Sequence, residues 1–212
     1  IAIGADGFPV ISYWDGTNYD LKFVKCGNAT CSVGNIILVD SIGSVGLYSS
    51  IAISVDGFPV ISYYDTINGD LKFVKCGNAS CSSGNSIIIL DSTGVVGSYG
   101  SMAIGAGGFP VISFVQFGSP NKLKVVKCGN AACSSGNTIN IVDSSVMSIG
   151  FTSTAIGANS FPVISYHNFT NLDLKFVKCG NVACSSGNTI STIDSLGSVG
   201  EGNSIDIGSD VA

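Results

Sequence analysis

The sequence contains no arginine and few charged residues of any kind. Its cationic side chains are nine lysines, and thirteen of its fourteen acidic residues are aspartates, with Glu201 as the single glutamate and His167 as the single histidine. Only 11% of the residues are charged, and the net charge is −5. Binding to nucleic acid requires a cluster of lysine and arginine side chains that neutralises phosphates. We therefore expect no nucleic-acid partner.

Long apolar stretches and helical patterning are also missing. No apolar run approaches the roughly twenty residues that cross a bilayer as a helix, so we expect no membrane span. The chain is nevertheless 45% hydrophobic and rich in Val, Ile, Ser and Gly, without the apolar spacing of an amphipathic helix. This pattern predicts a soluble, folded, all-β protein with almost no helix. Since Ile1 already lies inside a repeat, we expect a removed leader or a longer parent chain.

One unit of about fifty residues occurs four times. With small variations, each copy carries G-F-P-V-I-S, then L-K-x-V-K-C-G-N, then C-S-x-G-N and D-S. The copies span residues 1–50, 51–101, 102–153 and 154–204. Residues 205–212 restate the start of the unit, so we expect them to form the first strand of a further blade or a segment exchanged with a neighbouring molecule. Periods of this size are typical of solenoids and propellers.

Each unit predicts four short strands. In the second copy we expect strands at residues 50–55, 60–64, 71–76 and 86–90, with Asn68-Gly69 as the hairpin turn between the second and third. The first strand is poor in large side chains, which suits a crowded position near an axis. The pattern predicts a β-propeller of four-stranded antiparallel blades. The alternative is a β-solenoid or an open repeat array.

Eight cysteines form one C-x4-C pair in each repeat. Zinc sites need four converging ligands, whereas each repeat offers two thiols and no nearby histidine, so we expect local disulfides and no metal. Four disulfides are typical of a secreted or cell-surface protein, and three possible N-glycosylation sites fit that location. The expected disulfides join Cys26 to Cys31, Cys76 to Cys81, Cys128 to Cys133, and Cys179 to Cys184. The glycosylation candidates are Asn28, Asn78 and Asn168.

The repeat resembles the secreted sialidase-like (BNR-type) β-propeller repeats of prokaryotes. The second copy shows the resemblance as G-F-P-V-I-S-Y-Y-D from Gly57, G-D-L-K from Gly69 and L-D-S from Leu90. The resemblance implies a secreted propeller. Sialidases hold their substrate with an arginine cluster, and this chain has neither arginine nor the Asp-box S-x-D-x-G-x-T-W. We therefore expect a non-catalytic relative.

Other kinds of catalysis are not indicated either. A glycosidase needs two carboxyl groups in different environments, but the aspartates of the D-S step recur in every repeat, which favours a role in turns or caps. These residues are Asp40, Asp91, Asp143 and Asp194. His167 occupies the position of Trp14, Tyr64 and Val115 in the other copies, which suggests polar surface. We expect no enzyme activity and no cofactor.

The hairpin between the second and third strands is the most variable part of the repeat. In a propeller these hairpins emerge on one face, so their side chains would gather at one rim. Exposed rings beside aspartate suit sugar binding, whereas the alternative is unconstrained variation with rings packed between blades. Asp15, Asn18 and Asp20 also offer oxygen ligands for Ca²⁺, although hairpin-turn chemistry accounts for them. The candidate residues are Trp14, Asp15, Tyr19, Tyr64, Asp65, Phe117, His167 and Phe169.

These observations lead to two functional hypotheses. The first is an extracellular structural or adhesive propeller scaffold that polymerises through its terminal segment, with further copies or other surface proteins as partners. The second is a lectin-like propeller that binds glycans on the variable hairpin face.

Overall fold

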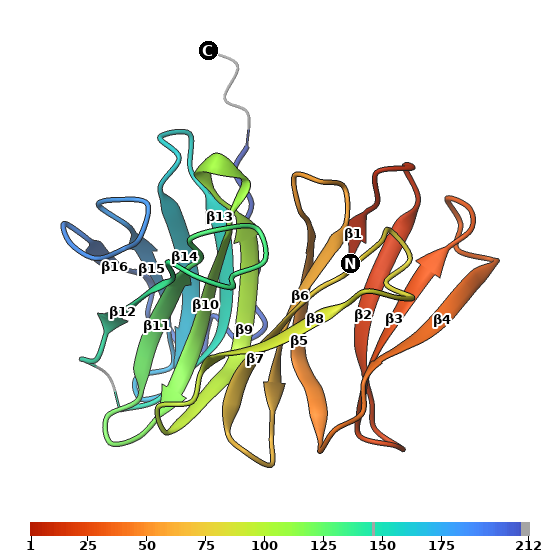
Figure 1. Cartoon of the computed structure of the whole chain (residues 1–212). Helices are drawn as coiled ribbons and strands as arrows, with labels where there is room; N and C mark the ends of the chain where they lie inside the picture. Colours follow the sequence, from red (N-terminus) through yellow and green to blue (C-terminus); the bar gives the residue numbers. More distant parts are fainter. Residues whose placement is uncertain (146, 209–212) are drawn as a thin grey trace.

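The computed structural model describes residues 1–145 and 147–208 and consists of four antiparallel sheets, each of four consecutive strands (Figure 1). Blade 1 contains β1 (Ala2–Ile3), β2 (Pro9–Asp15), β3 (Asp20–Cys26) and β4 (Gly34–Asp40). Blade 2 contains β5 (Val45–Ile53), β6 (Pro59–Asp65), β7 (Asp70–Lys75) and β8 (Ser86–Asp91). Blade 3 contains β9 (Val95–Ile104), β10 (Pro110–Phe117), β11 (Lys122–Lys127) and β12 (Thr138–Asp143). Blade 4 contains β13 (Ile149–Ile156), β14 (Pro162–Asn168), β15 (Asp173–Lys178) and β16 (Thr189–Asp194).

The predicted all-β fold of four-stranded antiparallel blades is confirmed. The first strands β1, β5, β9 and β13 lie next to one another in chain order, and the later strands of each blade follow outward, as in a β-propeller. One 3₁₀ turn, η1 (Ala106–Gly108), joins β9 to β10. In the described part of the chain, no helix has the length and apolar character needed to cross a membrane.

The innermost strand of blade 2 is longer than the sequence predicts. We expected strand 50–55 in blade 2, but β5 begins at Val45 and contains two register shifts against β6. Gly46 makes this path possible, since its φ is +106° and a Cβ there would lie 2.8 Å from the Cα of Leu21. A bulge keeps the strand paired while it bends. The glycine-rich stretch that resembles a connection is therefore part of the sheet.

Three hydrophobic cores lie between successive blades. Alternate residues of a strand face opposite sides of the sheet, so each middle blade contributes one face to the core before it and the other to the core after it. We call the side turned toward the following blade the forward face and the other side the backward face. Between blades 1 and 2, the forward residues are Val10, Leu21 and Phe23, and the backward residues are Ile61, Tyr63 and Val74, all 0% exposed. The same repeat positions form the two later cores.

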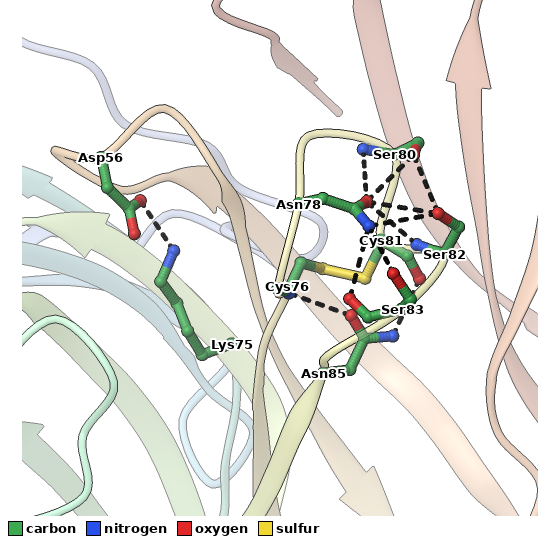
Figure 2. Close-up of a disulfide and its surroundings, with 10 residues drawn as sticks. Asp56, Lys75, Cys76, Asn78, Ser80, Cys81, Ser82, Ser83 and Asn85 are labelled. Atoms are coloured by element: carbon green, nitrogen blue, oxygen red, sulfur yellow. Dashed lines mark hydrogen bonds and ion pairs between the residues drawn. A yellow bond between two sulfur atoms is a disulfide. The ribbon is translucent and has the colours of Figure 1, made fainter.

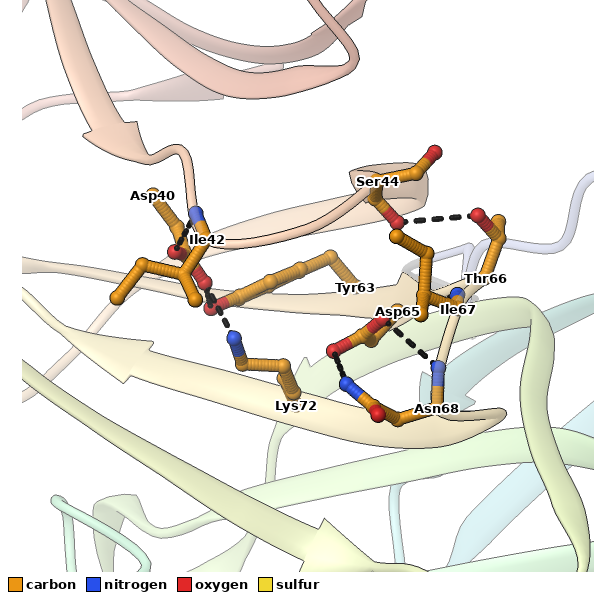
Figure 3. Close-up of polar contacts among 9 residues, drawn as sticks. All are labelled: Asp40, Ile42, Ser44, Tyr63, Asp65, Thr66, Ile67, Asn68 and Lys72. Atoms are coloured by element: carbon orange, nitrogen blue, oxygen red, sulfur yellow. Dashed lines mark hydrogen bonds and ion pairs between the residues drawn. The ribbon is translucent and has the colours of Figure 1, made fainter.

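A buried polar contact joins each pair of blades beside its core. The Oδ1 atom of Asp40 accepts a hydrogen bond from the backbone N–H of Ile42 at 3.1 Å, which confirms the expected turn role. Its Oδ2 atom contacts blade 2, where it accepts a hydrogen bond from the Tyr63 hydroxyl at 2.7 Å and forms an ion pair with Lys72 (Figure 3). Burial opposes ionisation of Asp40, but the hydrogen bonds from Lys72 and Tyr63 outweigh it and lower its pKa. We call this arrangement the blade latch.

The latch recurs with different partners at the other two interfaces. Asp91 pairs with Lys124, where Phe114 replaces the tyrosine. Asp143 accepts the hydroxyl of Tyr166. Burial opposes ionisation of Asp143 as well, but its hydrogen bonds outweigh this effect and lower its pKa. Sequence analysis predicted the turn role of these aspartates and missed their second role between blades.

The four predicted disulfides are confirmed, with Cα–Cα separations of 4.7–4.8 Å. Each closes the loop between the third and fourth strands of a blade. The second cysteine of every pair has a positive φ, between +50° and +54°, and this left-handed conformation lies where the loop reverses direction. The bonded pairs are Cys26 with Cys31, Cys76 with Cys81, Cys128 with Cys133, and Cys179 with Cys184.

An asparagine side chain organises each disulfide loop from inside. In blade 2 the Oδ1 atom of Asn78 accepts the backbone N–H groups of Ser80 at 3.1 Å and Ser82 at 3.2 Å (Figure 2). The Asp56–Lys75 ion pair lies at the same end of the blade. The loop is therefore held by local hydrogen bonds as well as by its disulfide.

A candidate binding site built from aromatic side chains

Three aromatic residues occupy the bulges of the innermost strands. Tyr48, Tyr99 and Phe151 have φ angles of +53°, +53° and +50°. A left-handed conformation is unusual for a bulky residue and costs on the order of 1–3 kcal/mol, and such strain concentrates at functional sites. Because the strain recurs at one position in three blades, we select these residues as the centre of a candidate site.

The three rings form a continuous row across blades 2, 3 and 4. The centroids of Tyr48 and Tyr99 are 4.6 Å apart, and those of Tyr99 and Phe151 are 5.1 Å apart. We call this row the aromatic ladder. Beside it lies a shallow hollow of about 210 Å³, and its lining includes polar groups near the rings. The lining residues are Tyr48, Ser49, Tyr99, Gly100, Phe151, Thr152, Gly202 and Asn203.

Several predicted hairpin residues extend the ladder. The ring of Tyr64 lies 6.4 Å from Tyr48, and that of Phe117 lies 6.5 Å from Tyr99. Phe169 lies 5.7 Å from Phe151 and 6.3 Å from Tyr99. The hairpins of blades 2, 3 and 4 therefore converge on one aromatic cluster.

In blade 1 the predicted residues form a separate pair. The rings of Trp14 and Tyr19 lie 5.9 Å apart and are 38% and 52% exposed. Asp15 holds the hairpin turn, since it accepts the backbone N–H of Thr17 at 2.9 Å and the side-chain amide of Asn18 at 2.8 Å. Hydrogen bonds from Lys22, Asn18 and Thr17 keep the pKa of Asp15 well below its usual range. Its carboxylate is therefore engaged in turn chemistry, which supports that interpretation over a calcium site.

Three of the predicted residues, Tyr64 among them, are buried rather than exposed at the rim. Tyr64 and Asp65 are 9% and 2% exposed, and His167 is 1% exposed. The expectation that His167 is polar surface is wrong, because the rings of Phe169 and Phe151 lie 4.5 and 6.4 Å from it. Neither ring nitrogen of His167 has a hydrogen-bond partner among the residues that the structure describes.

The predicted glycosylation sites differ in accessibility. Asn28 and Asn78 are partly exposed, and their side chains cap the disulfide loops. Asn168 is 0% exposed. A glycan on its side-chain amide would not fit within this packing.

Sequence analysis missed the ladder itself. Tyr48, Tyr99 and Phe151 recur at intervals of 51 and 52 residues, shortly after a glycine in each case. That periodicity was the available signal, but the positive φ angle that places the rings together follows from the bulge, which the sequence pattern does not reveal.

The ladder offers stacking surfaces and neutral hydrogen-bonding groups. Burial and the neighbouring Tyr99 hydroxyl raise the pKa of Tyr48 to about 12, so the Tyr48 hydroxyl remains protonated at neutral pH. Aromatic faces with a polar edge suit the C–H surface and hydroxyl groups of a sugar ring. Within residues 1–145 and 147–208, no three His, Cys, Asp or Glu side chains gather as a metal site would require.

Comparisons with known proteins support the fold but not a function. No protein-family model matches the chain, and neither does any curated protein. It is similar to a crystal structure of a protein of unknown function from Dyadobacter fermentans DSM 18053, with a TM-score of 0.62 and 10% sequence identity. The match covers 82% of this chain, which spans 58% of the length of the other. The resemblance to sialidase-like repeats stays an expectation from sequence.

Proposed function

We propose that this chain is an extracellular, non-enzymatic β-propeller scaffold with an adhesive outer edge. The observation that carries the proposal is a pair of exposed aliphatic side chains on the outermost strand of blades 1, 2 and 3. In blade 2, for example, Ile87 and Ile89 are 39% and 56% exposed on β8. The corresponding pairs are Ile36 with Leu38 and Ile139 with Ile141. Blade 4 has Ile190 and Thr192 at these positions.

Exposed apolar side chains on an edge strand are unusual. Such a strand also presents unpaired backbone groups, and folded proteins normally protect these edges with charges, bulges or covering segments. Exposed apolar clusters of this kind mark surfaces that contact other molecules. Three repeated pairs at the periphery favour repeated adhesive contacts over a single ligand pocket.

The rest of the molecule suits a rigid support for such contacts. Three similar cores and blade latches hold the blades in a fixed order, and a disulfide fastens a loop of each blade. Disulfides persist in oxidising compartments. This chemistry supports the proposed extracellular location.

The adhesive edge is tested by charging one of the aliphatic pairs. The double variant with Ile87→Lys and Ile89→Lys should bind a methyl-terminated glass surface less than the wild-type chain, because two desolvated aliphatic contacts are replaced by ammonium groups. Ser86→Lys is the matched control, since Ser86 is exposed on the same strand and its replacement removes no apolar contact. Equal retention of all three proteins would contradict the proposed adhesive edge.

The aromatic ladder supports glycan binding as a second candidate function. The specific observation is the strained row of Tyr48, Tyr99 and Phe151 beside a hollow that contains Asn203. On an array of neutral oligosaccharides, binding should occur with the wild-type chain and disappear with Tyr99→Ala. Ile42→Ala is the control, because Ile42 is exposed and lies outside the ladder and its hollow. An array without any binding would remove this candidate.

A further inference from the structure

The two end blades each leave one face without a neighbouring blade. On the forward face of blade 4, Leu174 and Phe176 are only partly buried, although Leu71 and Phe73 at the same positions of blade 2 are 0% exposed. A hollow of about 380 Å³ opens on this side of blade 4, with Phe161 and Lys178 in its lining. The end of the array therefore presents an incomplete inter-blade core.

The backward face of blade 1 presents the complementary half. Its partly buried residues are Ile11, Tyr13 and Val24. Their counterparts in blade 2 are Ile61, Tyr63 and Val74, which are 0% exposed against blade 1. The two end faces thus carry the two sets of side chains that form every internal core of this protein.

The blade latch is divided between the same two ends. Asp194 stands at the latch position of blade 4, where its Oδ1 atom keeps the turn hydrogen bond from Leu196 at 3.0 Å while the side chain is exposed. The matching donors on blade 1 are Lys22, which pairs with Asp15 of its own hairpin, and the partly buried Tyr13. An acceptor lies at one end and its two donors lie at the other.

Residues 199–207 already lie where the first strand of a following blade belongs. The N–H of Val199 donates to the carbonyl of Leu172 at 2.9 Å, and the N–H of Ile205 donates to the Ser153 hydroxyl at 3.1 Å. Equivalent hydrogen bonds hold the innermost strands of earlier blades in place. The N–H of Val45 donates to the carbonyl of Tyr19 at 2.9 Å, and the N–H of Met102 donates to the hydroxyl of Ser50 at 3.0 Å. Residues 205–208 are nevertheless not in a strand, and residues 209–212 lie outside the described residues, so the strand predicted at 205–212 is not formed within the described part.

The first strand of blade 1 is shorter than the first strand of blade 2. The strand β1 contains two residues and pairs only with Pro9 and Val10 of β2, whereas β5 extends along β6 as far as Asp65. Residues 199–204 correspond in the repeat to residues 45–50, which form the first part of β5. Residues 205–208 correspond to residues 1–4, so one of these two segments leaves its position when the blades join.

We propose that blade 4 of one copy binds blade 1 of a second copy in the manner of an internal blade interface. In this contact the carboxylate of Asp194 accepts hydrogen bonds from the side chains of Lys22 and Tyr13 of the second copy. Leu174 and Phe176 cover the backward face of blade 1 in the second copy, and residues 199–204 pair with the inner edge of its β2. The proposal specifies the partner and the surface for the scaffold function proposed above, on which it rests. Because the two surfaces differ, the contact is head to tail and yields a closed ring or a filament.

A charge exchange across the interface tests this inference. The variants Asp194→Lys and Lys22→Asp should each lower the association affinity of the full chain by at least about tenfold, because each places like charges together. Mixing the two variants should restore association, since each interface then contains one lysine and one aspartate. Asp56→Lys, which changes an exposed aspartate in a central blade, should associate like the wild type. Sedimentation velocity over a concentration series measures the association, and circular dichroism confirms that each variant folds.

The possible results separate the inference from the function on which it rests. Weakened single variants with restoration in the mixture would establish the interface, whether the product is a ring or a filament. Wild-type association that both single variants retain would overturn this interface and leave a self-associating scaffold in place. A wild-type chain that remains monomeric at every concentration would overturn the interface and the association of copies alike, while binding to the methyl-terminated surface would still report on the adhesive edge.

Discussion

Removal of Asp40 should cost far more stability than removal of an exposed aspartate that also pairs with lysine. Asp40, Tyr63 and Lys72 are 4%, 0% and 9% exposed, so Asp40→Ala leaves an ammonium group and a hydroxyl without their buried acceptor. Truncating one partner of a buried ion pair costs about 3–5 kcal/mol. Since the end of the Lys72 side chain can turn toward solvent, we expect the lower end, about 3 kcal/mol.

The matched control is Asp56→Ala. Asp56 pairs with Lys75 in the same blade, but its side chain is 45% exposed, and a surface pair of this kind contributes less than about 1 kcal/mol. Urea unfolding followed by circular dichroism, with the disulfides intact, measures the free energy of unfolding of both variants. If Asp40→Ala and Asp56→Ala destabilise the protein equally, the blade latch does not hold the blades together and our reasoning is wrong.

Three further predictions concern pH and the strand bulge. The lowered pKa values of Asp40 and Asp143 contribute stability that is present above their ordinary pKa of 3.8 and is lost as the pH falls through the folded-state values. The melting temperature should therefore decrease when the pH is lowered below about 4. The decrease should be smaller in a latch variant that lacks Asp40. The raised pKa values of Tyr48, Tyr63 and Tyr166 contribute stability that is present below pH 10.0 and is lost as the pH rises through the folded-state values, which for Tyr48 is about 12. Ultraviolet titration should show that these three phenols ionise at higher pH than ordinary tyrosines. Titration of all seven tyrosines near pH 10 would contradict this prediction. Gly46→Ala should destabilise the fold by about 2 kcal/mol or more, because it adds a Cβ 2.8 Å from the Cα of Leu21 at a residue with a positive φ. The control is Gly7→Ala, whose added Cβ meets no atom within 4 Å. In the same urea assay this control should show only the cost of the backbone strain.

The repeat pattern predicted most of the fold because each level of the sequence favours the same structure. Short runs of β-branched and aromatic residues such as the one from Pro59 to Asp65 indicate the strands, and Asn68-Gly69 fits the turn between two of them. The spacing of Cys76 and Cys81 predicted a local disulfide that the structure contains. These features depend on neighbours along the chain, which a single sequence shows directly.

The features that sequence analysis missed depend on contacts between repeats. The recurring D-S step made Asp40 look like a turn residue, and one of its oxygens does accept the N–H of Ile42. The other oxygen contacts Tyr63 and Lys72, which lie more than twenty residues away in the chain. His167 looked polar, but Phe151 from another strand lies near it. Tyr48 looked like part of a connection, and its position in the aromatic ladder results from a bulge. Periodicity identifies equivalent positions, but it does not say which equivalent residues touch.

The most direct test of the head-to-tail contact between copies is a three-dimensional electron-microscopy map of the particle as purified from its source. The account predicts copies joined head to tail, with blade 4 of one copy packed on blade 1 of the next and residues 199–204 alongside β2 of that neighbour. Isolated four-blade particles with both end faces open to solvent would contradict it.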